Sequence, residues 1–300
     1  MDPEFRSRFN AAFSDDRYAE MLRVANETER WPVDFRISET PLFLTPAFTT
    51  EVTQAAEAIV AQVRTAEFAE HAKAAIPPGL EVPRETPHPT FLQVDFAICE
   101  HHGRLVPRLI ELQGFPSLYA FQILLLHSMR HAFPAIPAGW QPFFHGLDEH
   151  SYVEMLRKVI VGDADPETVV LLEIEPEKQN TRIDFACTDT LLGVAPVSLT
   201  EVTRRGNELF YRRDGREVRI ERIYNRVIFD ELLRRPDLSF GFGFQHEIDA
   251  KWIGHPNWYF RISKHSLPFL KTEHTSRAFF ADEFPAGESL EQFVLKPLYS

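Results

Sequence analysis

Glycine and cysteine are scarce in this 300-residue chain, which has 13 glycines, two cysteines and 22 prolines. The two cysteines, Cys99 and Cys187, provide neither a disulfide framework nor a thiolate metal site, and they favour a reducing, cytoplasmic location. Neither Gly-x-x-x-x-Gly-Lys-Ser/Thr nor Gly-x-Gly-x-x-Gly occurs, so a P-loop or Rossmann nucleotide site has no support. Gly-x-Ser-x-Gly is also missing, which weakens a hydrolase interpretation.

An excess of basic charge and long apolar runs are missing as well. The chain has 32 Lys and Arg against 44 Asp and Glu, a net charge of −12. This balance argues against nucleic acid, whose phosphates need a basic face, and against a polybasic membrane patch. The longest apolar run, Phe121 to Leu126, is interrupted by Gln122 and is far shorter than the roughly 18 residues of a membrane span. The segment from Met1 to Arg23 is charged throughout, so we expect no secretory signal.

The composition is that of an ordinary globular protein, and a chain of this length can bury about three-quarters of its unfolded surface. Apolar residues spaced by three and four predict helices, and short apolar runs bounded by turn residues predict strands. The expected helices cover 49–76, 116–131, 149–161 and 177–192. The expected strands cover 91–96, 105–112, 168–174, 194–199, 208–212, 218–223 and 292–298. Helices and strands alternate along the middle of the chain, so the sequence predicts an α/β fold with a helical N-terminal segment.

Three polar residues fall on two neighbouring expected strands: Asp95, Glu111 and Gln113. Residues two apart in a strand share a face, so Glu111 and Gln113 point the same way. Two carboxylates and an amide oxygen make a hard-oxygen site suited to Mg²⁺, which water and phosphate usually complete. The alternative is a partly exposed sheet face with ordinary polar residues.

Two lysines lie in apolar surroundings. Lys296 falls inside the expected strand 292–298, where an unpaired ammonium is costly, so we expect it to point toward an anion. Lys264 lies between two largely apolar segments. Either lysine could instead extend its charged end to water.

Taken in order along the chain, these residues resemble a known family. The motifs resemble those of the glutathionylspermidine synthase-like proteins, which have a circularly permuted ATP-grasp fold. They are Asp95, Glu111-x-Gln113, Pro256-x-Trp258, Ser263-Lys264 with Leu267-Pro268, and Val294-x-Lys296-Pro297. The resemblance implies ATP-grasp-like mixed sheets flanked by helices. It implies that Asp95, Glu111 and Gln113 hold Mg²⁺ and that Lys264 and Lys296 contact ATP. The family joins a carboxylate to an amine through an acyl phosphate.

The chain also departs from the family pattern. Gln93 stands where the family has the arginine of its Arg-x-Asp strand, and it takes that place as a catalytic candidate. Gln113 and Ser263 each replace an asparagine. The glycine-rich loop that follows the Lys-Pro strand in the family is missing before Ser300, so we expect either a C-terminally incomplete chain or a degenerate relative. The resemblance implies a helical region over 1–85, an α/β region with the Mg²⁺ site over 86–235, and a partial nucleotide-binding region over 236–300.

Other charged residues have more than one interpretation. Arg226 follows an expected strand and could hold a substrate carboxylate or acyl phosphate with two parallel hydrogen bonds, or form a surface salt bridge with Asp230 or Glu231. Glu173 and Glu175 are expected to share a strand face and could recognise an amine, although an acidic pair at a strand end is the preferred interpretation.

A metal site on a helix is a more remote possibility. His127 and His131 are four residues apart and could share a metal, but the sequence shows no third ligand. Asp163 and Asp165 resemble a cation loop without its glycine and distal glutamate, and we interpret them as a turn.

The sequence thus predicts an ATP- and Mg²⁺-dependent ligase that joins a small carboxylate to an amine or a thiol. Its expected partners are small molecules, with no nucleic acid and no membrane, and the net charge favours a cationic amine. A non-catalytic ATP-grasp-like scaffold is the alternative, and a metal-dependent hydrolase is the remote one.

Overall fold

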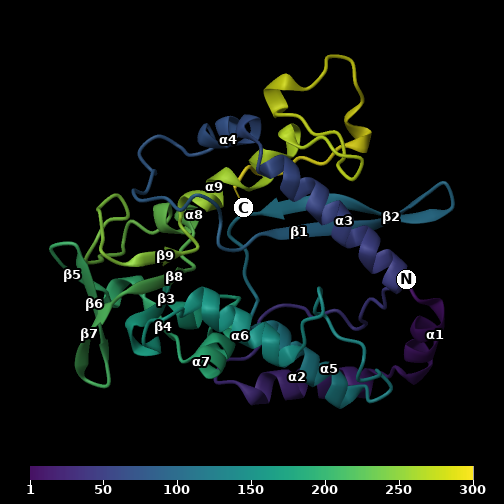
Figure 1. The fold of residues 1–300 in the computed structure, drawn as a ribbon, viewed down its shortest axis with the longest axis horizontal. Helices are drawn as coiled ribbons and strands as arrows, with labels where there is room; N and C mark the ends of the chain where they lie inside the picture. The colour runs from purple at the N-terminus through teal and green to yellow at the C-terminus, as the bar shows by residue number, and fades with distance from the viewer. Residues whose placement is uncertain (300) are drawn as a thin grey trace. The chain divides into compact units, whose positions relative to one another are not determined.

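The computed structural model describes residues 1–299, which form two compact units (Figure 1). Unit 1 consists of Met1–Thr45, Ser117–Val227 and Arg235–Ile253, and unit 2 of Pro46–Pro116, Ile228–Arg234 and the chain from Gly254 onward. The helices of unit 1 are α1 (Pro3–Ala12), α2 (Asp15–Thr28), α5 (Phe121–Ala132), α6 (Glu149–Ile160) and α7 (Arg182–Leu192). Its strands are β3 (Val169–Glu173), β4 (Ala195–Ser198), β5 (Thr203–Arg205), β6 (Glu208–Arg213), β7 (Arg216–Ile220), β8 (Arg222–Asn225) and β9 (Lys251–Ile253).

Unit 2 combines one long hairpin with helices. Its strands are β1 (Gln93–His101) and β2 (Arg104–Gln113), and its α-helices are α3 (Pro46–Val63), α4 (Ala66–Lys73), α8 (Phe229–Leu233) and α9 (Asn257–Arg261). The 3₁₀-helices are η4 (Lys264–Phe269), η5 (Ala281–Glu283) and η6 (Leu290–Gln292). The predicted α/β class, with mixed sheets and a helical N-terminal segment, is confirmed.

A four-stranded parallel sheet is the centre of unit 1. The strand order is β4-β3-β8-β9, and every neighbouring pair is parallel. Strand β3 is buried along its whole length, as expected for a parallel strand covered on both faces. The chain leaves β3 toward β4 on one side and reaches β8 on the other side, so the connections reverse direction between β3 and β8. Ligands of open parallel sheets bind outside the carboxyl ends of the strands at such a point.

An aromatic core joins the N-terminal helices of unit 1 to α5 and α7. The buried residues of this core include Phe9, Met21, Phe121, Phe133 and Cys187. Burial raises the pKa of the Cys187 thiol. A smaller antiparallel sheet, β5-β6-β7, turns at Asp214-Gly215, where both residues have positive φ as a tight hairpin requires.

Asp184 is the most buried charged group of unit 1. It lies in the first turn of α7, and its carboxylate accepts the backbone N–H groups of Leu118 (3.2 Å) and Phe121 (2.9 Å) at the start of α5. Burial raises the pKa of Asp184, and the charge of Arg226 acts in the opposite direction. One acidic side chain therefore satisfies donors that α5 cannot pair within itself.

Unit 2 packs helices against one face of the hairpin, and α3 crosses the hairpin obliquely (Figure 1). The buried residues of this core include Ile59, Phe68, Leu109, Leu112 and Ile262. The other cysteine, Cys99, is half-buried in β1.

The proline-rich connector before the hairpin is held by the segment that contains Pro256-x-Trp258. The Asn257 side chain exchanges hydrogen bonds with the backbone of Val82, and Trp258 Nε1 donates to Thr86 Oγ1. His255, fully buried, pairs its Nε2 with the Pro83 carbonyl oxygen. This motif therefore fastens the connector.

Several predicted boundaries were wrong. The helix expected over 49–76 is two helices, because Thr65 caps a new start at α4. The helix expected over 177–192 begins only at Arg182, and the strand expected over 218–223 is divided between β7 and β8. The strand expected over 292–298 does not form. Its residues Val294 and Leu295 are 81% and 89% exposed, and Pro297 cannot donate to a ladder.

None of the helices in the described part of the chain is long and apolar enough to cross a membrane.

Replacing Asp184 by alanine tests its role at the start of α5. We expect Asp184→Ala to lower the free energy of unfolding by about 2–4 kcal/mol, because two buried N–H groups lose their acceptor. Urea denaturation measures this loss. Asp184→Asn keeps one acceptor oxygen and is expected to lose less. An unchanged denaturation midpoint in the alanine variant would contradict this role.

Candidate functional site

The register of the hairpin brings four polar residues of unit 2 onto one face. Gln93 lies opposite Gln113, and Asp95 lies opposite Glu111. Directly paired residues of antiparallel strands point to the same side of the sheet, and so do residues two apart. The structure therefore places all four side chains together, on the face opposite the core of unit 2.

A β-bulge next to this group makes the arrangement possible. Glu111 pairs with Asp95 and Leu109 pairs with Phe96, so Ile110 is an extra residue in β2. Strict alternation would put Leu109 on the same face as Glu111. With the bulge, Leu109 enters the core and Glu111 stays on the polar face.

Two sets of bonds hold the polar residues, one centred on Asp95 and one between Glu111 and Lys264. Asp95 Oδ1 accepts from Gln93 Nε2 at 2.8 Å, and Asp95 Oδ2 accepts from Gln113 Nε2 at 2.9 Å. Lys264 Nζ lies 2.7 Å from Glu111 Oε1, and these two side chains are 13% and 23% exposed. The ion pair is thus largely shielded from water, unlike most lysine–carboxylate pairs at protein surfaces.

The backbone around Lys264 is held from two sides. Ser263 caps η4, its hydroxyl accepting the His265 N–H at 3.2 Å. On the hairpin side, Gly114 N–H donates to the Ile262 carbonyl oxygen at 2.8 Å. A Cβ at Gly114 would lie 2.7 Å from the Trp258 carbonyl oxygen and 2.8 Å from Ile262 Cβ, so only glycine fits. This close approach places η4 beside the end of β2.

Lys296 does not lie on a strand, which corrects the expectation from sequence. Its Nζ donates to the carbonyl oxygen of Ile110 at 3.0 Å, at the bulge of β2. The partner is a neutral carbonyl group, not the anion that the sequence led us to expect.

Arg226 belongs to unit 1, immediately after β8. It is 6% exposed, so it is a buried residue. It lies where the connections of the parallel sheet reverse, as does the end of β3 at Glu173. The preceding residue, Asn225, is fully buried, and its Nδ2 has no hydrogen-bond partner within residues 1–299.

Sequence reasoning did not single out Asn225 or Asp184. The Asn225-Arg226 pair closely follows the strand expected over 218–223, a signal that could have drawn attention to Asn225. Asp184 gives no such signal, because an acidic residue in the first turn of a helix is common at protein surfaces.

The other acidic candidates of unit 1 have local partners. Glu175 lies beyond the end of β3, with a φ of 46°, and pairs with Lys178 and with Arg235. It does not share a strand face with Glu173, so that expectation was wrong. Asp165 caps a short 3₁₀ turn, as expected.

The two helical histidines face different carboxylates. His127 Nε2 lies 2.9 Å from Glu149 Oε1, and His131 Nε2 lies 3.0 Å from Glu20 Oε1. Within residues 1–299, no group of three or more His, Cys, Asp and Glu side chains has the geometry to hold a metal.

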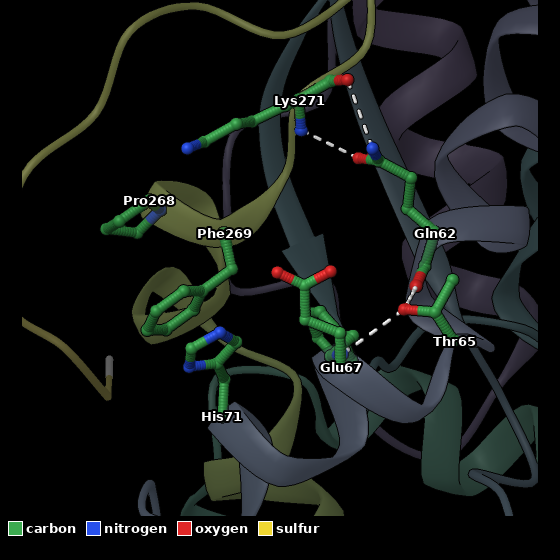
Figure 2. Close-up of a pocket in the computed structure, with 8 residues that line it drawn as sticks. Gln62, Thr65, Glu67, His71, Pro268, Phe269 and Lys271 are labelled. Atoms are coloured by element: carbon green, nitrogen blue, oxygen red, sulfur yellow. Dashed lines mark hydrogen bonds between the residues drawn. The ribbon is translucent and has the colours of Figure 1, made fainter.

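A pocket of unit 2 lies away from the polar group, beside α4 (Figure 2). Its volume is about 580 Å³, which includes the open solvent at its mouth. Figure 2 shows the Glu67 carboxylate directed into it, and the His71 ring stacks on Phe269 with 4.0 Å between centroids. Gln62 forms two hydrogen bonds with the backbone of Lys271, of 2.6 Å and 3.0 Å. Pro268 of the Leu267-Pro268 motif lines this pocket, but none of the candidate metal, nucleotide or catalytic residues does.

The donor chemistry of the polar group fits Mg²⁺. Asp95 and Glu111 supply carboxylate oxygens, and the amides of Gln93 and Gln113 can each present an oxygen by turning over. Hard oxygen donors with room for water are what Mg²⁺ prefers. The negative charge of the polar group comes from two carboxylates, those of Asp95 and Glu111. Lys264 neutralises the carboxylate of Glu111.

Comparison with known proteins adds a fold likeness. No family model and no curated protein sequence matches the chain. A solved structure of a glutathione synthetase-like effector, GSS30 from Globodera pallida in its apo form, matches 91% of this chain and 67% of its own. Its TM-score is 0.50 and its sequence identity is 13%. The chain has a glutathione synthetase-like fold. At this identity the likeness concerns the fold alone, and the resemblance to glutathionylspermidine synthase-like proteins stays a prediction.

Gly114 provides a test of how η4 is positioned. We expect Gly114→Ala to lower the free energy of unfolding by about 1–3 kcal/mol, because the added methyl group overlaps the backbone of Trp258 and the side chain of Ile262. Chemical denaturation measures the loss. Gly139→Ala, at a glycine with open space around it, is the matched control. Equal stability of the two variants would show that the contact is not tight.

Proposed function

We propose that this protein is an ATP- and Mg²⁺-dependent ligase of the ATP-grasp type, similar to glutathionylspermidine synthase-like proteins, that joins a small carboxylate to an amine or a thiol. The main support is the group formed by Asp95, Glu111 and Lys264, in which two carboxylates and an ammonium share one sheet face. Phosphoryl transfer depends mainly on positioning and on neutralising phosphate charge, and this group contains both kinds of side chain.

The proposal gives each side chain a role. Asp95, Glu111 and Gln113 would hold Mg²⁺, which neutralises phosphate charge when bound. Lys264 would bind a nucleotide phosphate, because its ammonium group carries three donors on a flexible stem. Lys296 would be a second nucleotide contact, at the edge of the same hairpin.

Arg226 and Asn225 of unit 1 are proposed to bind the acid substrate. A guanidinium group can hold a carboxylate with two parallel hydrogen bonds. The free Nδ2 of the buried Asn225 is a donor that still needs an acceptor. Both residues lie at the sheet position where open α/β sheets bind ligands.

The proposed reaction has two steps. A carboxylate oxygen of the acid attacks the γ-phosphorus of ATP, which gives an acyl phosphate and ADP. The amine or thiol then attacks the acyl carbon, expels inorganic phosphate and loses a proton. Gln93, as a neutral amide, can donate a hydrogen bond to the acyl oxygen but cannot neutralise its charge.

The glutamine at position 93 favours a second candidate, a non-catalytic protein that binds nucleotide or a small acid. Gln93 stands at the position of a catalytic arginine, and its amide is already bonded to Asp95. A protein of this kind would keep nucleotide affinity and lose the transfer step.

The first test is release of ADP from Mg²⁺ and ATP in the presence of pooled small carboxylates and amines. We expect Glu111→Ala to abolish turnover, because the metal site loses half of its charge. Glu100→Ala is the matched control, since Glu100 lies exposed on the same hairpin outside the polar group. Circular dichroism checks that both variants fold.

Two results would count against the ligase proposal. Unchanged turnover in Glu111→Ala would remove the metal site. Nucleotide binding without ADP release under any substrate pool would favour the non-catalytic candidate.

A further inference from the structure

Three of the four carboxylate oxygens of the candidate metal site accept a donor from the protein itself. Both Asp95 oxygens accept amide N–H groups, from Gln93 and Gln113, and Glu111 Oε1 is paired with Lys264. A cation that approaches this face must therefore displace donors that already bind the carboxylates.

The glutamine amides and the Lys264 ammonium differ in whether they can stay in place when a cation binds. A glutamine amide can turn over and offer its oxygen, so Gln93 and Gln113 can change from competitor to ligand without moving away. Lys264 has three N–H donors and no acceptor, and its positive charge repels a metal ion nearby. Lys264 therefore has to leave Glu111 before a metal can bind there.

The backbone near Lys264 is held on both sides. The capping by Ser263 fixes the start of η4, and the two hydrogen bonds that Gln62 exchanges with the backbone of Lys271 fix the chain just after its end (Figure 2). Between these points, the four-carbon stem of Lys264 can change rotamer without a shift of the main chain.

We propose that Lys264 couples nucleotide binding to metal binding: it guards Glu111 in the ligand-free protein and frees this carboxylate only when a nucleotide phosphate draws the ammonium away. This inference rests on the proposed function. Because coupling between two ligands is reciprocal, the metal favours the nucleotide as much as the nucleotide favours the metal. The metal alone binds weakly, and the pair binds cooperatively.

The test measures the affinity of Mn²⁺, as a spectroscopic substitute for Mg²⁺, for the full chain without nucleotide. Electron paramagnetic resonance reports the free ion. We expect Lys264→Met to bind Mn²⁺ at least tenfold more tightly than the unmodified protein, because Glu111 is released. Lys264→Arg keeps a cation at Glu111 and is expected to bind as weakly as the unmodified protein.

Matched variants separate this effect from a general change of charge. Lys271→Met removes one positive charge just after the same 3₁₀-helix, and its Mn²⁺ affinity should stay within twofold of the unmodified protein. Adding Glu111→Gln to Lys264→Met should abolish the gain. Lys264→Gln is a second neutral variant, should the methionine variant fold poorly.

The outcomes distinguish the inference from the proposed function. Equal, Glu111-dependent Mn²⁺ binding with and without Lys264 would overturn the guarding role and leave the metal site in place. If no variant binds Mn²⁺ through Glu111, both the guarding role and the proposed metal site are wrong.

Discussion

The pairing of Asp95 with Glu111 across the β1–β2 hairpin is the constraint on which the candidate site depends. A shift of one residue in this pairing would send one carboxylate to the core face. The bulge at Ile110 fixes the register, since it is the only way for Leu109 and Leu112, three residues apart, to enter the same core. The apolar packing of unit 2 thus decides where its polar group lies.

In unit 1, by contrast with the hairpin of unit 2, important polar residues lie inside the protein. Asp184 and Arg226 are both buried; burial raises the pKa of Asp184, and the charge of Arg226 opposes that rise. A buried carboxylate is costly unless it is hydrogen-bonded, and Asp184 meets this condition with two backbone N–H groups. The same acidic side chain thus bonds the start of α5 and senses the charge of Arg226, just after β8.

Much of the polar group could be predicted from the sequence, because strand alternation alone places Glu111 and Gln113 on one face. The contact of Lys264 with Glu111 could not, since it joins residues 153 positions apart and depends on the close approach at Gly114. The strand expected around Lys296 failed for a related reason: an apolar run becomes a strand only beside a partner strand, and local pattern cannot supply the partner. Helix and strand types were predicted well where apolar periodicity was long, as in α6 and β3, whereas Asp184 looked like an ordinary residue at the start of a helix. The roles proposed for these side chains stay predictions.

The two native cysteines differ in accessibility, so the protein can be labelled at a single site. Cys187 is sealed in the aromatic core with a raised pKa, so it offers little thiolate to an alkylating reagent. Cys99 is half-buried in β1. By strand alternation it lies on the same face of the strand as Asp95. A maleimide dye added to the native protein should therefore attach at one position, on the very strand whose polar face is in question. The hairpin can be watched by fluorescence without a single engineered cysteine.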